Sequence, residues 1–344
     1  MATGLREMTL EQRRQMVDTE QLWQAWGATR KRNAGYAGSM GWRTSKGREY
    51  LVRQVAENGS RRMRSLGPRS IETERVLQQF QDNKATAQAD LKKQSSRLGE
   101  MARLNRALRL GRVPMASANV ARVLDKHGLL GRNILIVGTN AIFAYEAAAG
   151  VFVDTSMLAT GDLDILFDAR VRLRLRSEAE PPTLMSALKA ADASFERVTH
   201  RSFSAVNSDG FYVDLIKAPP KDIVTSAETD TLGGDNDLHA SHVPNMRWVA
   251  NAPKFSAMAI GADGFPVPLS CPDPRAFALY KLWMGTKDST REPLKRVRDI
   301  EQAKTVAAMV NGHMANLPFE PEHLACFPRR ATNLAMDNNF FRLA

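Results

Sequence analysis

The segment from residue 134 to 168 constrains the fold of this chain more than any other. Its first four residues, 134–137 (ILIV), are branched and apolar, which predicts a short strand buried on both faces. Gly138 and Thr139 end this strand, and an apolar helical segment follows them. Backbone N–H groups at the start of a helix have no partners within the helix and commonly bind phosphate. The Gly-Thr turn is therefore a predicted phosphate-binding site.

Two carboxylates follow in the same segment. Residues 160–167 read TGDLDILF, so Asp162 and Asp164 are two apart on a predicted strand. Side chains two apart on a strand point to the same side of the sheet. Like charges so placed repel each other unless a cation joins them, and Mg²⁺ with oxygen ligands is the usual cation. Asp162 and Asp164 are therefore predicted metal ligands.

A third carboxylate, Asp214, lies in the strand-like segment 211–216 (FYVDLI), after the turn sequence NSDG. The order of Gly-Thr turn, helix, Asp-x-Asp strand and later Asp resembles the DNA polymerase beta type nucleotidyltransferase superfamily. The chain is more similar still to bacterial nucleotidyltransferase-fold proteins that have a helical N-terminal region and no settled substrate. An alternative is that Asp162 only caps a turn and that Asp214 is an exposed strand residue.

The resemblance implies that Asp162, Asp164 and Asp214 hold two Mg²⁺ ions and are the catalytic residues. It further implies that Gly138 and Thr139 hold the phosphates of an NTP. In relatives of the superfamily a lysine on the helix after the sheet reaches the nucleotide phosphates. Lys281 resembles that lysine in place, and Lys295, Arg298 and Asp299 on the next helix are similar to charged residues that flank the nucleotide.

Charge is distributed unevenly along the chain. The net charge is +11, and residues 1–132 contain 26 Lys and Arg against 12 Asp and Glu. The cluster Arg61, Arg62 and Arg64 lies in this basic third, which suggests a polyanionic partner, most commonly nucleic acid. RNA is the favoured partner. A basic helical surface that only keeps the protein soluble is the alternative.

Composition bounds the class of protein. Apolar residues make up 43% of the chain, enough for a packed core. No apolar run reaches membrane-helix length and no signal peptide is recognisable, so we expect a cytoplasmic protein with no membrane partner. Cys271 and Cys326 are too isolated for a disulfide framework or a zinc site, and we expect reduced thiols.

The expected fold class is α+β: a mixed sheet of nucleotidyltransferase type with flanking helices, preceded by a mostly helical N-terminal region and followed by a helical C-terminal part. The expected boundaries are 1–115, 116–270 and 271–344. Helices are expected over 10–26, 116–126, 184–191, 275–284 and 292–310, a long helix or helical hairpin over 70–110, hairpins over 195–217 and 254–269, and a polar, glycine-rich loop over 27–47.

The first hypothesis is an enzyme that moves an NMP from an NTP to a hydroxyl acceptor. RNA, especially transfer RNA, is the favoured acceptor, and a protein hydroxyl, as in toxin-type relatives, stays open. The alternative is a non-catalytic module that binds nucleic acid or a partner. The presence of all three carboxylates argues against this alternative, since an inactive site has no physical reason to retain charges that repel each other. A role in toxin–antitoxin or phage-defence systems is compatible with either chemistry.

Overall fold

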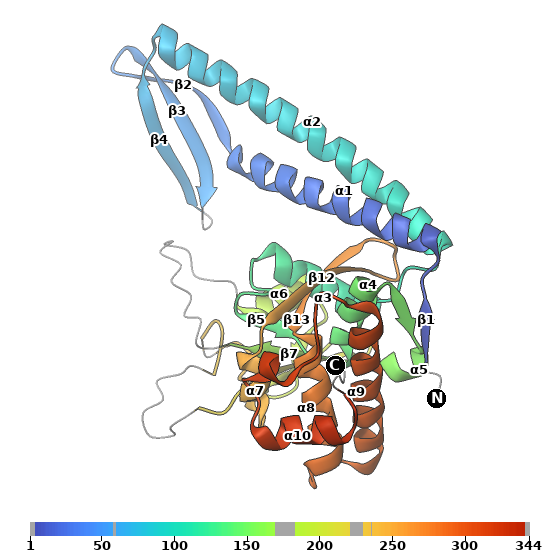
Figure 1. Cartoon of the computed structure of the whole chain (residues 1–344). Coiled ribbons are helices and arrows are strands. Elements are labelled where there is room, and N and C mark those ends of the chain that lie inside the picture. The colour runs from blue at the N-terminus through green and yellow to red at the C-terminus, as the bar shows by residue number, and fades with distance from the viewer. Residues whose placement is uncertain (1–3, 58–59, 169–182, 221–229, 235, 341–344) are drawn as a thin grey trace.

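A computed structural model of the chain describes residues 4–57, 60–168, 183–220, 230–234 and 236–340. A long arm formed by the N-terminal region rises from a core that contains a mixed sheet and its flanking helices (Figure 1). The predicted α+β class is confirmed. None of the helices in the described part of the chain combines the length and apolar composition that a bilayer crossing needs.

Two antiparallel helices form the arm, α1 (Leu10–Gly35) and α2 (Ile71–Ala107). Thr9 and Ser70 start them with capping boxes, in which the hydroxyl accepts from the third helical N–H and the third side chain bonds back. Apolar residues are sparse along both helices, because each buries only a narrow stripe against the other. The prediction of a long helix over 70–110 is confirmed as one continuous helix.

The region between the arm helices differs from the prediction. The first helix continues through Gly27 to Gly35, and a three-stranded antiparallel sheet follows, whose first strand lies within the loop expected over 27–47. Leu51 is the one described side chain of this sheet that is fully buried, so an alternation of apolar and polar residues is nearly absent from its sequence. The strands are β2 (Ser39–Ser45), β3 (Arg48–Glu57) and β4 (Ser60–Pro68).

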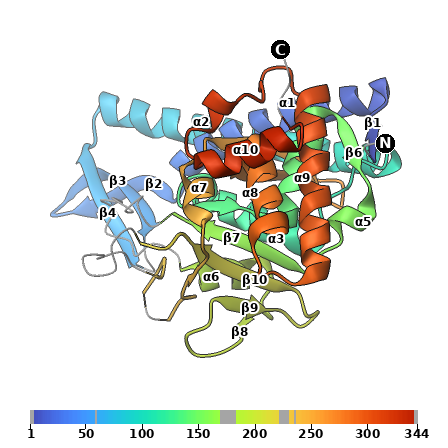
Figure 2. The ribbon, with the colours of Figure 1, turned by 60° about the horizontal axis from the view of Figure 1, so that its bottom comes forward.

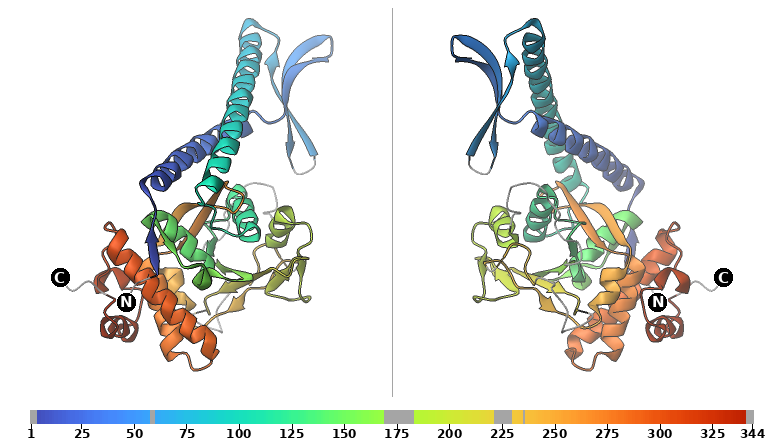
Figure 3. Two further views of the ribbon diagram at one scale, coloured as in Figure 1. Left: turned by 90° about the vertical axis from the view of Figure 1, so that its right-hand side faces the viewer. Right: turned by 90° about the vertical axis from the view of Figure 1, so that its left-hand side faces the viewer.

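The arm joins the core at its base. The N-terminal strand β1 (Leu5–Glu7) pairs with β6 (Val151–Val153) of the core. The Asn105 side chain of α2 donates to the carbonyl of Gly264 at 2.8 Å. A Cβ on Gly264 would collide with the carbonyl oxygen of Ala102, so the helix passes directly over this turn. Two views from opposite sides show the sheet of the arm separate from the core (Figure 3).

The core sheet has the strand order β5-β7-β10-β9-β8, with β11 beside β10. Strands β7 and β10 are parallel neighbours, whereas β5 and β9 run antiparallel to them. The predicted hairpin that contains β9 and β10 is confirmed, as is the hairpin of β12 and β13, which packs against β5 and α4. The bounds are β5 (Ile134–Ile136), β7 (Asp162–Phe167), β8 (Glu196–Arg197), β9 (Ser204–Val206), β10 (Tyr212–Lys217), β11 (Ser241–His242), β12 (Lys254–Ile260) and β13 (Pro266–Pro272).

The two faces of the core sheet have different surroundings. Leu163 and Ile165 of β7, and Val213 of β10, point into the main apolar core. Leu166 and Ile216 point to the opposite face, where a smaller cluster packs under the short helix α7. The period of two along each strand places Asp162, Asp164 and Asp214 on this second face.

Helices cover the core on several sides. The antiparallel pair α8 and α9 packs closely together (Figure 2). All the helices expected in this part of the chain are present. The bounds are α3 (Met115–Lys126), the 3-10 turn η1 (Gly138–Ala141), α4 (Ile142–Ala149), α5 (Thr155–Leu158), α6 (Leu184–Ala191), α7 (Met246–Asn251), α8 (Pro274–Lys287), α9 (Pro293–His313), the 3-10 turn η2 (Pro321–Leu324) and α10 (Arg329–Asp337).

Candidate active site

The parallel pair β7 and β10 brings the three predicted carboxylates onto one surface. Asp214 lies directly opposite Asp164 in the register, and Asp162 lies opposite Tyr212. Residues that face each other across neighbouring strands point to the same side of a sheet. The three aspartates therefore share one face and one end of this strand pair.

The Gly138 turn lies directly beneath Asp164. The backbone of Gly138 has a φ of +64°, which glycine adopts without strain, and a Cβ there would collide with Oδ2 of Asp164. The turn is also bonded to β7: the Val137 N–H donates to the Asp164 carbonyl at 3.0 Å, and the Asn140 amide donates to the Asp162 carbonyl at 2.8 Å. The two halves of the sequence motif thus form a single rigid unit.

Burial and, to a smaller extent, neighbouring negative charge change the acidity of the site. Burial, followed by the charge of Asp162, raises the pKa of Asp164 to about 6, although the nearby Lys281 opposes this shift. Burial also raises the pKa of Asp214, with a smaller contribution from Asp162, whereas a hydrogen bond from Ser204 lowers it. The site therefore holds unbalanced negative charge that a cation would neutralise.

Two of the carboxylates are hydrogen-bonded to neighbouring hydroxyls. The Thr160 hydroxyl donates to Oδ1 of Asp162, and the Ser204 hydroxyl donates to Oδ1 of Asp214 at 2.6 Å. In the described part of the chain no three His, Cys, Asp or Glu side chains are gathered as a ready metal site. The donors are nevertheless all oxygen and repel one another, which suits Mg²⁺. In donor type, the three aspartates therefore fit that ion.

Thr139, the second residue of the predicted phosphate site, is held by α9. Its hydroxyl accepts from the Arg298 guanidinium at 2.8 Å and from the Gln302 amide at 3.2 Å. Thr139 is buried, so its hydroxyl is used to fix the turn against α9. Gln302 also donates to the carbonyl of Met157 at 2.8 Å, which ties α9 to the segment before β7.

Lys281 belongs to a buried group of charges between α8 and α9. Its Nζ lies 2.6 Å from Oδ1 of Asp299, and the Nε of Arg291 lies 2.8 Å from Oδ2 of the same carboxylate. Burial lowers the pKa of Lys281, against the attraction of Asp299. One carboxylate is thus shared by two cations, and the group carries a net positive charge toward Asp164.

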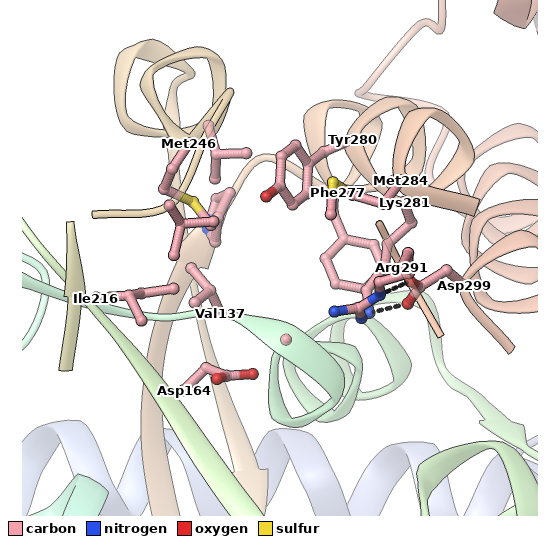
Figure 4. A pocket seen from close by; sticks show the side chains of 14 residues that line it. Val137, Asp164, Ile216, Met246, Phe277, Tyr280, Lys281, Met284, Arg291 and Asp299 are labelled. Carbon is pink, nitrogen blue, oxygen red and sulfur yellow. Dashed lines mark hydrogen bonds and ion pairs between the residues drawn. The ribbon is translucent and has the colours of Figure 1, made fainter. Parts of the chain in front are cut away.

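A pocket of about 160 Å³ connects this charged group with the sheet. Asp164 lies on one side of it, and Arg291, Lys281 and Asp299 lie on the other (Figure 4). Gly138 belongs to the same lining. The rest of the lining is mostly apolar and aromatic: Val137, Ile216, Val243, Met246, Val249, Pro272, Phe277, Tyr280 and Met284. Asp162 and Asp214 lie outside this lining. The combination suits a ligand with a flat apolar part and a negatively charged part.

Sequence reasoning missed several of these residues. Arg291 lies in the loop between α8 and α9, and nothing in its local sequence distinguishes it from other arginines. Tyr280 and Met246 look like ordinary apolar positions of short helices. Gln302 could have been found from its spacing, because it lies one helical turn after Arg298 and so shares its face.

The predicted arginine cluster of the arm is divided by the strand that carries it. Arg61, Arg62 and Arg64 are exposed residues of β4. Arg62 and Arg64 lie opposite Val55 and Arg53 in the register, so they point to one face, and Arg61 points to the other. The three arginines therefore cannot act as one patch on one face.

Comparisons with known proteins bear on the core. No protein of curated function and no solved structure matches the chain. A family model described as "Nucleotidyltransferase" matches residues 115–324, from the start of α3 to the end of η2. This match covers more than half of the chain and includes the three aspartates, the Gly-Thr turn and the pocket. The chain therefore belongs to this nucleotidyltransferase family.

Proposed function

We propose that the protein is a metal-dependent nucleotidyltransferase of the DNA polymerase beta type, which moves an NMP from an NTP to a hydroxyl acceptor. The observation that carries the proposal is the shared face of Asp162, Asp164 and Asp214 beside a pocket that contains Lys281 and Arg291. Nucleotidyl transfer needs chiefly positioning and charge stabilisation, and this arrangement offers both.

Asp162, Asp164 and Asp214 would hold Mg²⁺, with two ions expected. Bound Mg²⁺ lowers the pKa of an attacking hydroxyl and neutralises the pyrophosphate leaving group. The raised pKa of Asp164 supports this role, because burial and then the charge of Asp162 disfavour its carboxylate form, and a bound cation would favour that form.

The nucleotide would occupy the pocket between the sheet and α8. Lys281 uses one of its three ammonium protons for Asp299, so the others are available to phosphate oxygens. Arg291 adds a second positive charge on the same side. Gly138 lines the same pocket, where its bare backbone leaves room for the Asp164 carboxylate, and the aromatic wall of Tyr280 and Phe277 suits a base.

Asp214 is the proposed general base for the acceptor hydroxyl. Its side chain lies on the outer side of the pair, beside β9, and the hydrogen bond from Ser204 orients it. A raised pKa brings a carboxylate closer to the acidity that proton abstraction near neutral pH requires.

RNA is the proposed acceptor, because the excess positive charge lies in the N-terminal third rather than around the site. A protein hydroxyl is the competing acceptor, and it would fit a role as a toxin or defence element. The test incubates the purified protein with each labelled NTP, Mg²⁺, and either total cellular RNA or total protein. We expect label in the RNA fraction with the parent and none with Asp164→Asn. Label in neither fraction with the parent would overturn the proposal.

A further inference from the structure

The sheet at the far end of the arm has two faces with different surroundings. Arg53 of β3 lies with its guanidinium carbon 4.4 Å from the ring centre of Phe80 on α2 and donates to the carbonyls of Gly35 and Ala37. Leu51, two residues before it, is fully buried. The face that carries Leu51 and Arg53 is therefore the inner face, which packs against the arm helices.

The opposite, outer face follows from the register. Arg43 lies opposite Tyr50, Arg48 lies beside it on the same face, and Arg61 lies opposite Ala56. The three arginines are exposed, and in the described part of the chain none of them forms an ion pair with a carboxylate. Glu49 lies next to Leu51 along the inner face. Among the described side chains of the sheet, the outer face thus has three positive charges and no negative one.

Apolar and aromatic side chains lie among these charges. Tyr50 is half-buried in the middle strand, and Met63 on the neighbouring strand is 52% exposed. A flat sheet with an aromatic ring between cations is the arrangement that binds extended single strands, because bases stack on rings while phosphates pair with arginine. Every base has a face that can stack, so such a surface needs no particular sequence.

The sheet is attached at the end of the arm that is far from the core, since the 37 residues of α2 span about 55 Å. From this end its strands run back toward the core (Figure 1). A polymer that lies along the strands would therefore extend toward the core.

We propose that the outer face of the sheet, formed by Arg43, Arg48, Tyr50, Arg61 and Met63, binds single-stranded RNA and holds the acceptor of the reaction. The inference rests on the proposed function for the acceptor role, and the binding itself can be measured without it.

The test measures binding of a fluorescein-labelled oligouridine by anisotropy over a salt series, without nucleotide. The outer-face variant is Arg43→Gln, Arg48→Gln and Arg61→Gln. The matched control, Arg75→Gln, Lys92→Gln and Lys93→Gln, also removes three exposed charges from the arm, but from α2. Thermal unfolding of both variants verifies that they are folded.

We expect the outer-face variant to lower the slope of log affinity against log salt by about 2, at roughly 0.7 per phosphate contact, and the α2 variant to keep the parental slope. Tyr50→Leu should weaken binding about tenfold at an unchanged slope. Equal slope changes in the two charge variants, or tight binding of polyglutamate in place of RNA, would overturn the proposal.

Label transfer from NTP to RNA separates this proposal from the function of the core. RNA binding that depends on the outer face, without any label transfer, would support the RNA-binding surface and overturn the catalytic proposal. Transfer to RNA that the outer-face variant leaves unchanged would support the catalytic proposal and overturn the RNA-binding surface. Asp164→Asn should bind the oligouridine like the parent.

Discussion

Asp164 combines more constraints than any other residue of the site. It shares a face with two other carboxylates, its Oδ2 lies over the bare backbone of Gly138, and the charges of Lys281 and Arg291 oppose the rise of its pKa. The Asp-x-Asp pattern predicts its direction on the sheet. It cannot predict the contact with Gly138, since that contact depends on how β5 and β7 align in three dimensions.

Substitution of Asp164 by Asn should abolish transfer and change the response of stability to pH. The folded protein holds the Asp164 proton up to about pH 6, whereas an unfolded chain releases it near pH 4. This carboxyl therefore lowers the free energy of unfolding as the pH rises through that window, by at most about 3 kcal/mol. Metal-free urea unfolding on both sides of the window should show this decline in the parent and a smaller one in Asp164→Asn. An equal decline in both would contradict the burial of the charge.

Gly138→Ala should disturb the site even though it adds only one methyl group. The new Cβ would displace the Asp164 carboxylate and would strain a left-handed backbone, at a cost of about 1 kcal/mol or more. Transfer should fall at least tenfold. Gly161→Ala is the control, because its Cβ meets nothing within 4 Å and its φ is not positive. Similar transfer rates for the two variants would show that the turn does not position Asp164.

At the level of elements, α8 and α9 organise the positive side of the site. Asp299 is buried and shared by Lys281 and Arg291, so its removal would leave two cations without their anion. Asp299→Asn should lower the free energy of unfolding by about 3–5 kcal/mol, as the breaking of buried ion pairs commonly does. Chemical denaturation measures this difference. Glu301→Gln on the same helix breaks only an exposed pair with Lys304 and should change little.

The sequence predicted those elements whose apolar pattern is set by burial. The strands of Asp162 and Asp214 and the helices α8 and α9 were expected, because each has one strongly buried face. The sheet of the arm was not expected, since the run SRRMRSLGP of β4 has polar residues on both faces. The hydrogen bonds of Arg298 and Gln302 to Thr139 could not be predicted from a local pattern either, because these residues are 159 and 163 positions from Thr139 in the sequence.

For the whole molecule, the turn at Gly264 is a close contact between arm and core, where α2 meets the β12–β13 hairpin. Gly264→Ala combines a φ of +85° with a collision against the carbonyl oxygen of Ala102. It should loosen the base of the arm and speed limited proteolysis near the end of α2. Gly210→Ala isolates the strain of the backbone, because its φ of +76° is similar but its Cβ meets nothing within 4 Å. Equal proteolysis of the two variants would mean that the arm does not depend on this contact.

The pairing of β1 with β6 sets an order in which a nascent chain can fold. Residues 5–7 cannot find their partner until residues 151–153 have been made, and at 5–20 residues per second this takes roughly 7–30 s. The two arm helices and their sheet are complete well before then. During synthesis all residues of the arm helices and of their sheet are therefore present before the core residues that pair with β1 have been made.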